Sequence, residues 1–255
     1  MPGWESDFNS QSDGGDRFAP ITNVSLCSKA MMRAVERPLH LPGFVCFYGP
    51  SGWGKTFSAT YVQLNQGAYY IHCQESWTRK AVLLAMTKEL GLAPKKTNYE
   101  LIEQICQQLA SSKRPLIIDE FDHLVNRGAV EMIRDIYEGS FAAIMLIGEE
   151  LLPDKLKRWE RFHNRVLDWI PAQPADFDDC RSLSNFYCHE VALADDLLRF
   201  LLKECKRATR RIVVNIEKAR VAALEIGENE MDLALWERLG LVVSTGDAPK
   251  RRFIS

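Results

Sequence analysis

Short runs of apolar residues alternate, over most of the chain, with segments whose apolar residues recur at helical spacing. The apolar runs lie at 44–48, 68–73, 115–118, 142–147 and 166–170. Helical spacing occupies segments between or before them, at 30–37, 78–92, 99–111 and 129–138. Because parallel strands are joined through helices that cover both faces of a sheet, this alternation predicts an α/β domain built on a parallel five-stranded sheet.

The pattern changes after Pro171 and Pro174, where only helical spacing remains. It occupies 177–188, 194–205 and 209–226. We therefore expect a main domain at 21–172 and a small all-helical second domain at 173–227. Residues 1–20 are polar and rich in Ser, Asp, Gly and Asn, which predicts a flexible tail. Residues 228–255 are expected to form a C-terminal tail with one short helix in MDLALWERLG.

The first segment with recognisable chemistry is GPSGWGKT at 49–56, which fits the phosphate-loop pattern G-x-x-x-x-G-K-[ST]. It follows the strand at 44–48 directly and precedes a helix start, which is the structural context that the motif requires. Lys55 is expected to reach the β- and γ-phosphates of ATP, and Thr56 is expected to offer its hydroxyl to Mg²⁺. The backbone of the loop is expected to surround the phosphates through Gly49, Pro50, Ser51, Gly52, Trp53 and Gly54.

A second motif, PLIIDEFD at 115–122, is an apolar strand that ends in two consecutive acids. Asp119 is expected to hold Mg²⁺, and Glu120 is expected to act as the general base on a water molecule. An additional acid suits a water nucleophile, so the pair favours ATP hydrolysis over phosphoryl transfer to a small acceptor.

Composition limits the kinds of partner. A net charge of -2 and a pI near 6.2 indicate that any DNA contact is made by a local basic patch. The 7 cysteines are scattered without zinc-site spacing, which predicts reduced, mostly buried thiols. The N-terminus has no secretory pattern, and no apolar run approaches the ~20 residues needed to span a bilayer, so a cytoplasmic protein is expected.

Taken in order, GPSGWGKT, IIDEFD, an arginine-bearing helix and TRRIVVNI resemble the AAA+ ATPases. More narrowly, TNVSLCSKAMMRAVERP, ESWTRK, IGEELLP and RWERFHNRV resemble the target-DNA activator ATPases of transposable phages such as Mu and of Tn7-type transposons. The resemblance covers roughly residues 20 to 225. It implies an AAA+ P-loop NTPase fold with a helical lid, and assembly of the chain with copies of itself.

The resemblance also implies roles for arginines. In AAA+ proteins an arginine of one subunit reaches the γ-phosphate bound by its neighbour. Within ERFHNRV, Arg165 is the first candidate and Arg161 the second, with Arg158 third; the alternative is a helix with solvated arginines. Arg211, or its neighbour Arg210, resembles the lid residue that senses nucleotide, although charges at a helix start are commonly only solvated.

One segment departs from the AAA+ pattern. Many of these proteins place Asn, Ser or Thr at the end of the fourth strand, whereas IMLIGEE offers Gly148 and Glu149. The residue that orients the attacking water is therefore left open. The five histidines show no metal-site spacing and receive no role. Trp53 is expected to pack against the domain surface, with a contact to a neighbouring subunit as the alternative.

DNA binding is implied by the transposition branch of the resemblance. A helix-turn-helix module is expected before the ATPase domain of the phage Mu relative, and with only about forty residues there this chain is expected to lack one. Contact with duplex DNA would then fall to Thr78, Arg79 and Lys80, with Lys95 and Lys96 as further candidates. Such binding should be independent of DNA sequence and sensitive to salt.

These observations favour a Mg-ATP-dependent AAA+ ATPase that assembles on duplex DNA as a ring or filament and activates a transposase, with no membrane contact. A first alternative is a helicase loader or another replication ATPase, which would prefer single-stranded DNA. A second is an ATPase that acts on a protein partner without nucleic acid. A small-molecule kinase is disfavoured by the arginine segment and the helical lid.

Overall fold

The computed structural model describes residues 18–247. Most of the predicted N-terminal tail and the last residues of the C-terminal tail lie outside this range. Contacts divide the described residues into two units, Thr22–Pro174 and a second unit that groups residues 175–247 with residues 18–21. We call them the sheet unit and the helical unit and describe each by itself.

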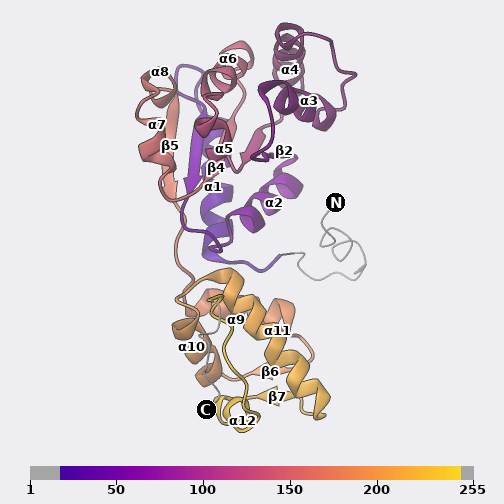
Figure 1. Ribbon diagram of the computed structural model, residues 1–255, viewed down its shortest axis with the longest axis vertical. Helices are drawn as coiled ribbons and strands as arrows, with labels where there is room; N and C mark the ends of the chain where they lie inside the picture. The colour runs from indigo at the N-terminus through magenta and orange to yellow at the C-terminus, as the bar shows by residue number, and fades with distance from the viewer. Residues whose placement is uncertain (1–17, 248–255) are drawn as a thin grey trace, which may run out of the picture. The chain divides into compact units, whose positions relative to one another are not determined.

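The sheet unit is built on a five-stranded parallel sheet with the strand order β2-β3-β4-β1-β5 (Figure 1). This confirms the parallel sheet predicted from the alternation of apolar runs and helical segments. The strands lie within one or two residues of the predicted runs; their bounds are β1 Phe44–Tyr48, β2 Tyr69–His72, β3 Leu116–Asp119, β4 Ile144–Gly148 and β5 Val166–Pro171.

Successive residues of the buried strands face two separate cores, as the two-residue period of a strand requires. Val45 and Phe47 of β1 pack with α1 (Thr22–Glu36) and α2 (Lys55–Gln66). Phe44 and Cys46 pack on the other side, against the remaining helices of the unit. Both faces of the central strands are therefore covered, which explains why these strands read as uninterrupted apolar runs.

The second face of the sheet is covered by the helices α3 Arg79–Glu89, α4 Asn98–Ser112, α5 Asp122–Asn126, α6 Val130–Ser140, α7 Leu152–Leu156 and α8 Glu160–His163. They differ from the prediction only in the short helices, which are too short to show a helical period. Sequence spacing missed α5 and α7, which have 5 residues each, and α8, which has 4 residues, was expected only from the family resemblance. It also placed the start of α1 at residue 30, eight residues late, because the polar side chains in the first half of that helix mask its apolar face.

The helical unit contains α9 Phe177–Tyr187, α10 Asp195–Glu204, α11 Thr209–Glu225 and α12 Leu233–Arg238. It is not purely helical as expected, because Ala192–Leu193 (β6) and Glu230–Met231 (β7) form a two-stranded parallel ladder. A run of two residues is too short to show as a strand in the sequence. Trp236 of α12 is buried and the Asn215 side chain bonds the backbone of Ser244, so ordered structure continues beyond residue 227.

The carboxyl ends of the parallel strands meet at one edge of the sheet, where clefts form in open α/β folds. The glycine-rich segment follows β1 at this edge, and Asp119 ends β3. Across residues 18–247, no helix is long and apolar enough to cross a membrane.

Candidate nucleotide-binding site

The segment between β1 and α2 forms a turn that depends on two glycines. Gly52 and Gly54 have φ angles of 82° and 81°, in the left-handed region that side chains disfavour. Gly54 caps α2, so the helix begins at Lys55 with its N–H groups directed toward the loop. The turn therefore presents backbone donors and the positive end of a helix to an anion.

The Lys55 ammonium lies over this loop. Its Nζ donates to the carbonyl oxygens of Gly49 at 2.6 Å and Pro50 at 2.9 Å. Burial lowers the pKa of Lys55, and the nearby carboxylates of Glu120 and Asp119 oppose that shift. A cation held close to its own loop is positioned to exchange these carbonyl contacts for phosphate oxygens.

Asp119 is the point at which β3, β2 and α2 meet. Its Oδ2 accepts hydrogen bonds from Thr56 Oγ1 at 2.9 Å and from the Tyr70 hydroxyl at 2.8 Å, and His72 Nδ1 lies 3.6 Å away. Its Oδ1 accepts from the Glu120 N–H at 2.8 Å. Burial alone would raise the pKa of Asp119, but His72 and these donors outweigh it and lower the pKa, so the carboxylate stays ionised.

Sequence patterns did not identify the contributions of β2. Tyr70 had no predicted function, and His72 was assigned no role, yet both side chains approach Asp119. His72 pairs in register with Asp119, since β2 and β3 are neighbours and end together. The nearby Asp119 carboxylate raises the pKa of His72. The sequence signal for this contact was a polar residue at the end of β2, the strand that lies beside β3.

Glu120 has an unusual backbone conformation, with a φ of 54° in the left-handed region. The residues on either side are fixed, because Asp119 is buried in the sheet edge and the Phe121 N–H donates to the Ile147 carbonyl at 2.8 Å. Strained backbone of this kind persists where surrounding contacts enforce it and is frequent at functional sites. The chain thus turns away from the direction of β3 at Glu120, directly after Asp119, and the Glu120 residue is half-buried.

A buried asparagine that prediction missed anchors the loop to the rest of the sheet unit. Asn23 of α1 donates to the Trp53 carbonyl at 2.7 Å and the Gln173 carbonyl at 2.8 Å, and accepts from the Gln173 N–H. The ring of Trp53 is partly buried against the core between α1, α2 and the sheet, as expected. An asparagine on the buried face of an apolar helix was the signal for this anchor.

Close packing at the end of β4 explains why position 148 is glycine and not the Asn, Ser or Thr of many AAA+ proteins. Any Cβ at this position would collide with Oδ2 of Asp122 and come within 2.7 Å of Leu152 Cδ2. The buried Asp122 carboxylate accepts from the Glu149 N–H and from Lys155 Nζ, both at 2.6 Å. The polar group at the end of β4 therefore comes from the segment after β3, and Asp122 had no predicted role.

The candidate arginines of the 158–165 segment do not approach the loop of their own subunit. The Arg165 carbonyl accepts from the N–H of Phe44, the first residue of β1, so Arg165 lies at the sheet edge opposite the loop. It forms an exposed ion pair with Glu138 at 3.0 Å. Arg161 is exposed on α8, and Arg158 donates to the Val125 carbonyl at 3.0 Å. Their predicted role in a neighbouring subunit stays a prediction.

Arg210 and Arg211 lie in the first turn of α11, in the helical unit. Arg210 is exposed, whereas the guanidinium of Arg211 packs against Gly246, where a Cβ would not fit. Their predicted contact with nucleotide also stays a prediction.

The predicted DNA contacts flank the start of α3. Thr78 caps this helix by accepting from the Ala81 N–H at 3.2 Å. Arg79 donates to the Gly128 carbonyl at 2.8 Å, and Lys80 donates to the Lys96 carbonyl at 3.0 Å. The two cations are thereby tied to neighbouring loops while their side chains remain exposed.

The oxygen donors beside the loop suit a magnesium ion bound together with ATP phosphates. Mg²⁺ prefers one or two protein oxygens, with substrate phosphates and water completing its ligands. The ionised Asp119 carboxylate and the Thr56 hydroxyl supply such oxygens at the phosphate loop. Within the part of the chain that the structure describes, no group of three or more His, Cys, Asp or Glu side chains could hold a metal ion by itself. All 7 cysteines are buried and unpaired, as expected.

Comparison with known families gives a match in the sheet unit. Residues 39–156 match the family described as AAA domain. The matched segment contains β1 to β4, the glycine loop, Asp119 and Glu120. No curated protein sequence matches the chain.

Several solved structures share the fold. The ORC2 protein of Aeropyrum pernix in its ADP form is 13% identical with a TM-score of 0.63, over 85% of this chain and 66% of that one. Domain III of the Thermotoga maritima replication initiation protein DnaA is 19% identical with a TM-score of 0.58, over 89% and 95%. The A. pernix ORC1 protein in complex with DNA is 18% identical with a TM-score of 0.59, over 85% and 63%.

These comparisons confirm the predicted fold class. The chain has the α/β AAA+ P-loop NTPase fold, and residues 39–156 match the AAA domain family. It spans less than two thirds of the length of either ORC protein. At such low identities the likeness extends to the fold alone.

Proposed function

We propose that this chain, whose residues 39–156 match the AAA domain family, is a Mg-ATP-dependent ATPase that assembles with copies of itself on DNA. The observation that carries the ATPase activity is the meeting of Thr56 and Asp119 at 2.9 Å beside Lys55 and Glu120. These groups come from two motifs more than sixty residues apart, and the fold brings them to one edge of the sheet.

Each residue of the site has a separate role in hydrolysis. The loop N–H groups and Lys55 would bind the phosphates, while Thr56 and Asp119 would hold the metal ion. When bound, Mg²⁺ neutralises charge on the β- and γ-phosphate oxygens. Glu120 accepts a proton from water as the water oxygen bonds to the γ-phosphorus and the bond to the bridging oxygen breaks, which releases ADP.

Arg165 of a neighbouring copy completes the site, with Arg161 as the second candidate. An arginine at the sheet edge opposite its own loop is free to serve the loop of another copy. Its ion pair with Glu138 is exposed, with 44% and 45% of the two side chains accessible, so breaking that pair costs little. Arg211, or Arg210, senses the nucleotide from the helical unit.

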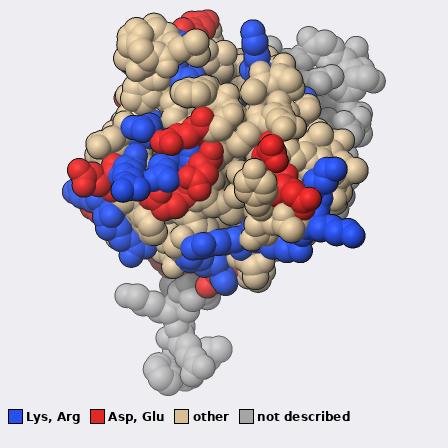
Figure 2. All heavy atoms as spheres, turned by 90° about the horizontal axis from the view of Figure 1, so that it is seen from above, with Lys and Arg blue, Asp and Glu red and all other residues tan. Residues whose placement is uncertain are grey.

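DNA binding is supported by local basic patches. On the face seen in Figure 2, Lys and Arg side chains are interspersed with Asp and Glu and do not form a continuous basic field. Exposed cations nonetheless gather at Arg79 and Lys80, next to Thr78, and Lys80 is tied to the loop bearing Lys95 and Lys96. Repetition of such a patch in an assembly would give sequence-independent, salt-sensitive binding.

Two biological roles fit this activity. We place a replication role first, as an initiator-like or helicase-loading ATPase, because the similar structures include a replication initiation protein and an ORC1 protein in complex with DNA. Activation of a transposase at target DNA is second. It is favoured by ESWTRK, IGEELLP and RWERFHNRV, which resemble the target-DNA activators of transposable elements.

Binding of labelled duplex and single-stranded DNA to the purified protein, with ATP, ADP or no nucleotide at two salt concentrations, tests the proposal. ATP-dependent, salt-sensitive binding in large assemblies is expected. Preference for single strands favours the replication role, and preference for duplex favours target selection. Absence of DNA binding in every state would overturn the DNA-binding part and leave an ATPase acting on a protein partner.

A further inference from the structure

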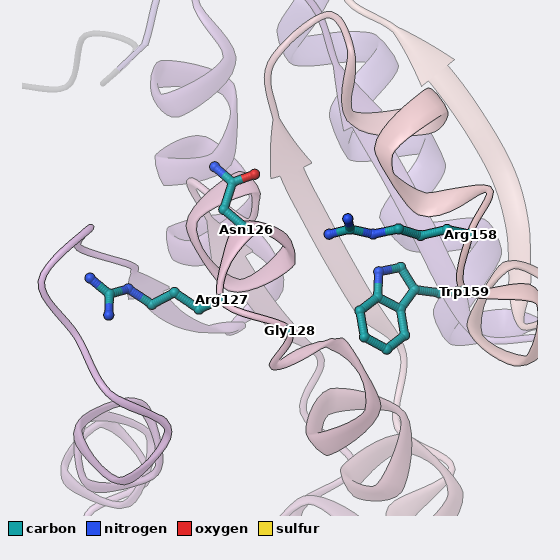
Figure 3. A pocket seen from close by; sticks show the side chains of 5 residues that line it. All are labelled: Asn126, Arg127, Gly128, Arg158 and Trp159. Atoms are coloured by element: carbon teal, nitrogen blue, oxygen red, sulfur yellow. The ribbon is translucent and has the colours of Figure 1, made fainter.

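A shallow hollow of about 490 Å³ lies between the turn that joins α5 to α6 and the loop that joins α7 to α8 (Figure 3). It is lined by Asn126, Arg127, Gly128, Arg158 and Trp159. Arg158 and Trp159 project from one side toward the turn, while Arg127 projects from the turn on its other side. Of these residues only Arg158, the third candidate for the arginine that reaches a neighbour's nucleotide, has a predicted role at the ATP site.

The arginines at this hollow lack acidic partners. Within residues 18–247, no Asp or Glu oxygen lies within 4.0 Å of the guanidinium groups of Arg79, Arg127 or Arg158. By contrast, Arg134 on α6 pairs with Glu131 and Asp135, and Arg165 pairs with Glu138. These exposed guanidinium groups without carboxylate partners therefore remain available to bind an anion.

Backbone contacts hold these arginines in place. Arg158 donates to the Val125 carbonyl at 3.0 Å, and Arg79 donates to the Gly128 carbonyl at 2.8 Å. Each uses one edge of its planar fork, which leaves further N–H groups for a ligand. Gly128 has a φ of 65°, so the turn between Arg127 and α6 requires glycine to keep its shape.

Trp159 forms one wall of the hollow. Its ring lies over Gly128, with Cη2 3.9 Å from the place of a Cβ there, and the Arg158 guanidinium is 5.6 Å from its centroid. Its buried indole N–H has no hydrogen-bond partner in the described part of the chain. A wall of this kind favours a ligand that combines charged oxygens with an apolar face.

The hollow is continuous with the patch predicted to contact DNA. The bond from Arg79 to Gly128 joins the start of α3 to the hollow, and the bond from Lys80 to the Lys96 carbonyl extends the same strip away from it. Cations thus follow one another from Lys96 to Arg158 across four segments of the sheet unit. A row of cations matches the repeating charge of a phosphodiester chain.

We propose that a nucleic-acid backbone passes over this hollow, with Arg158 donating to the oxygens of one phosphate and Trp159 covering the adjoining sugar or base. Arg127, on the other side of the turn, donates to a neighbouring phosphate of the same backbone. The proposal rests on the DNA-binding part of the proposed function and places part of the DNA contact at this hollow. It extends the DNA contact beyond Thr78, Arg79 and Lys80 to the segments that follow β3 and β4. Since the contacts are to the backbone, they do not read sequence.

The test measures binding of a labelled duplex to full-length protein in ATP, over a series of salt concentrations, for Arg127→Ala and Arg158→Ala. Each variant should bind about tenfold more weakly, and the slope of log K against log salt should decrease in magnitude by about 1. Two duplexes of unrelated sequence should lose affinity equally. Arg127→Ala should keep the basal ATPase rate measured without DNA.

Arg114→Ala is the matched control. Arg114 is an exposed arginine without an acidic partner in the described chain, but it precedes β3 at the opposite edge of the sheet and lies over the Tyr69 ring, 3.9 Å from its centroid. It should leave the affinity and the salt slope unchanged. Addition of inorganic phosphate as a competitor distinguishes a free-phosphate site from a backbone site.

The outcomes separate the two claims. If wild-type protein binds DNA and both variants match its affinity and salt slope, the hollow is not a contact site for DNA. The proposed function is then unaffected. Displacement of DNA by inorganic phosphate at low millimolar concentration, lost in Arg158→Ala, would assign the hollow to free phosphate instead. Wild-type protein that fails to bind DNA would overturn both claims.

Discussion

The hydroxyl of Thr56, in the first turn of α2, donates to the carboxylate of Asp119 at 2.9 Å and thereby joins the glycine loop to the end of β3. The same carboxylate oxygen also accepts from Tyr70. The two expected metal ligands are thus in place beside each other and held by other side chains. Little rearrangement is required of them before a metal ion and ATP bind.

Thr56→Val should raise the Mg²⁺ concentration needed for half-maximal hydrolysis by about 10-fold, because it removes a metal ligand while preserving shape. Thr56→Ser, which retains the hydroxyl, should restore the wild-type requirement. A magnesium titration of phosphate release measures both. An unchanged requirement in Thr56→Val would exclude the hydroxyl as a ligand.

Lys55→Ala should weaken ATP binding by about 10- to 150-fold, the loss of about 1.5–3 kcal/mol expected for a hydrogen bond to a charged group. Titration with a fluorescent ATP analogue measures the affinity. Lys88→Ala, which removes an exposed lysine of α3, is the control and should bind as the wild type does. Equal affinity of Lys55→Ala and wild type would contradict the placement of the phosphates.

Gly148→Ala should destabilise the protein by about 1–3 kcal/mol, the usual cost of overpacking, because its methyl group would meet Asp122 and Leu152. Urea unfolding followed by circular dichroism measures the free energy of unfolding. In an Asp122→Ala background the same change should cost less, since the two side chains compete for one space. Glu150→Ala, an exposed neighbour, should change stability by less than about 0.5 kcal/mol. Equal stability of Gly148→Ala and wild type would show that the end of β4 is not closely packed.

Arg165→Ala should reduce ATP hydrolysis by at least about 10³-fold in assemblies while ATP binding by the isolated subunit is retained. Arg165→Lys should not restore the rate, because an ammonium lacks the planar fork of the guanidinium. Hydrolysis is measured at protein concentrations below and above assembly. A normal rate in Arg165→Ala together with a loss in Arg161→Ala would move the role to Arg161.

Patterns in the sequence were sufficient for the sheet and for the principal acids. Strands such as Phe44–Tyr48 are apolar throughout because both faces are covered, and the glycine loop has a strict pattern. Both signals are local, so neither requires knowledge of the folded chain. Asp119 and Glu120 were identified because they follow such a strand directly.

Contacts that depend on neighbouring strands could not be obtained in this way. Tyr70 and His72 approach Asp119 only because β2 lies beside β3, and strand order is not encoded locally. Asp122 occupies the space beside Gly148 through a side-chain direction set by the short helix α5. The hollow at Arg158 joins segments about thirty residues apart and has no sequence pattern of its own.

The glycine loop and the end of β3 are proposed to form a site that hydrolyses ATP with Glu120 as its base. Phosphate release and ATP binding are therefore measured for Glu120→Gln, wild type and Glu149→Gln. Glu120→Gln should bind ATP normally and hydrolyse it at least about 100-fold more slowly, while Glu149→Gln should keep its rate. Normal hydrolysis by Glu120→Gln would exclude Glu120 as the base, and a loss in Glu149→Gln instead would assign the base to the end of β4.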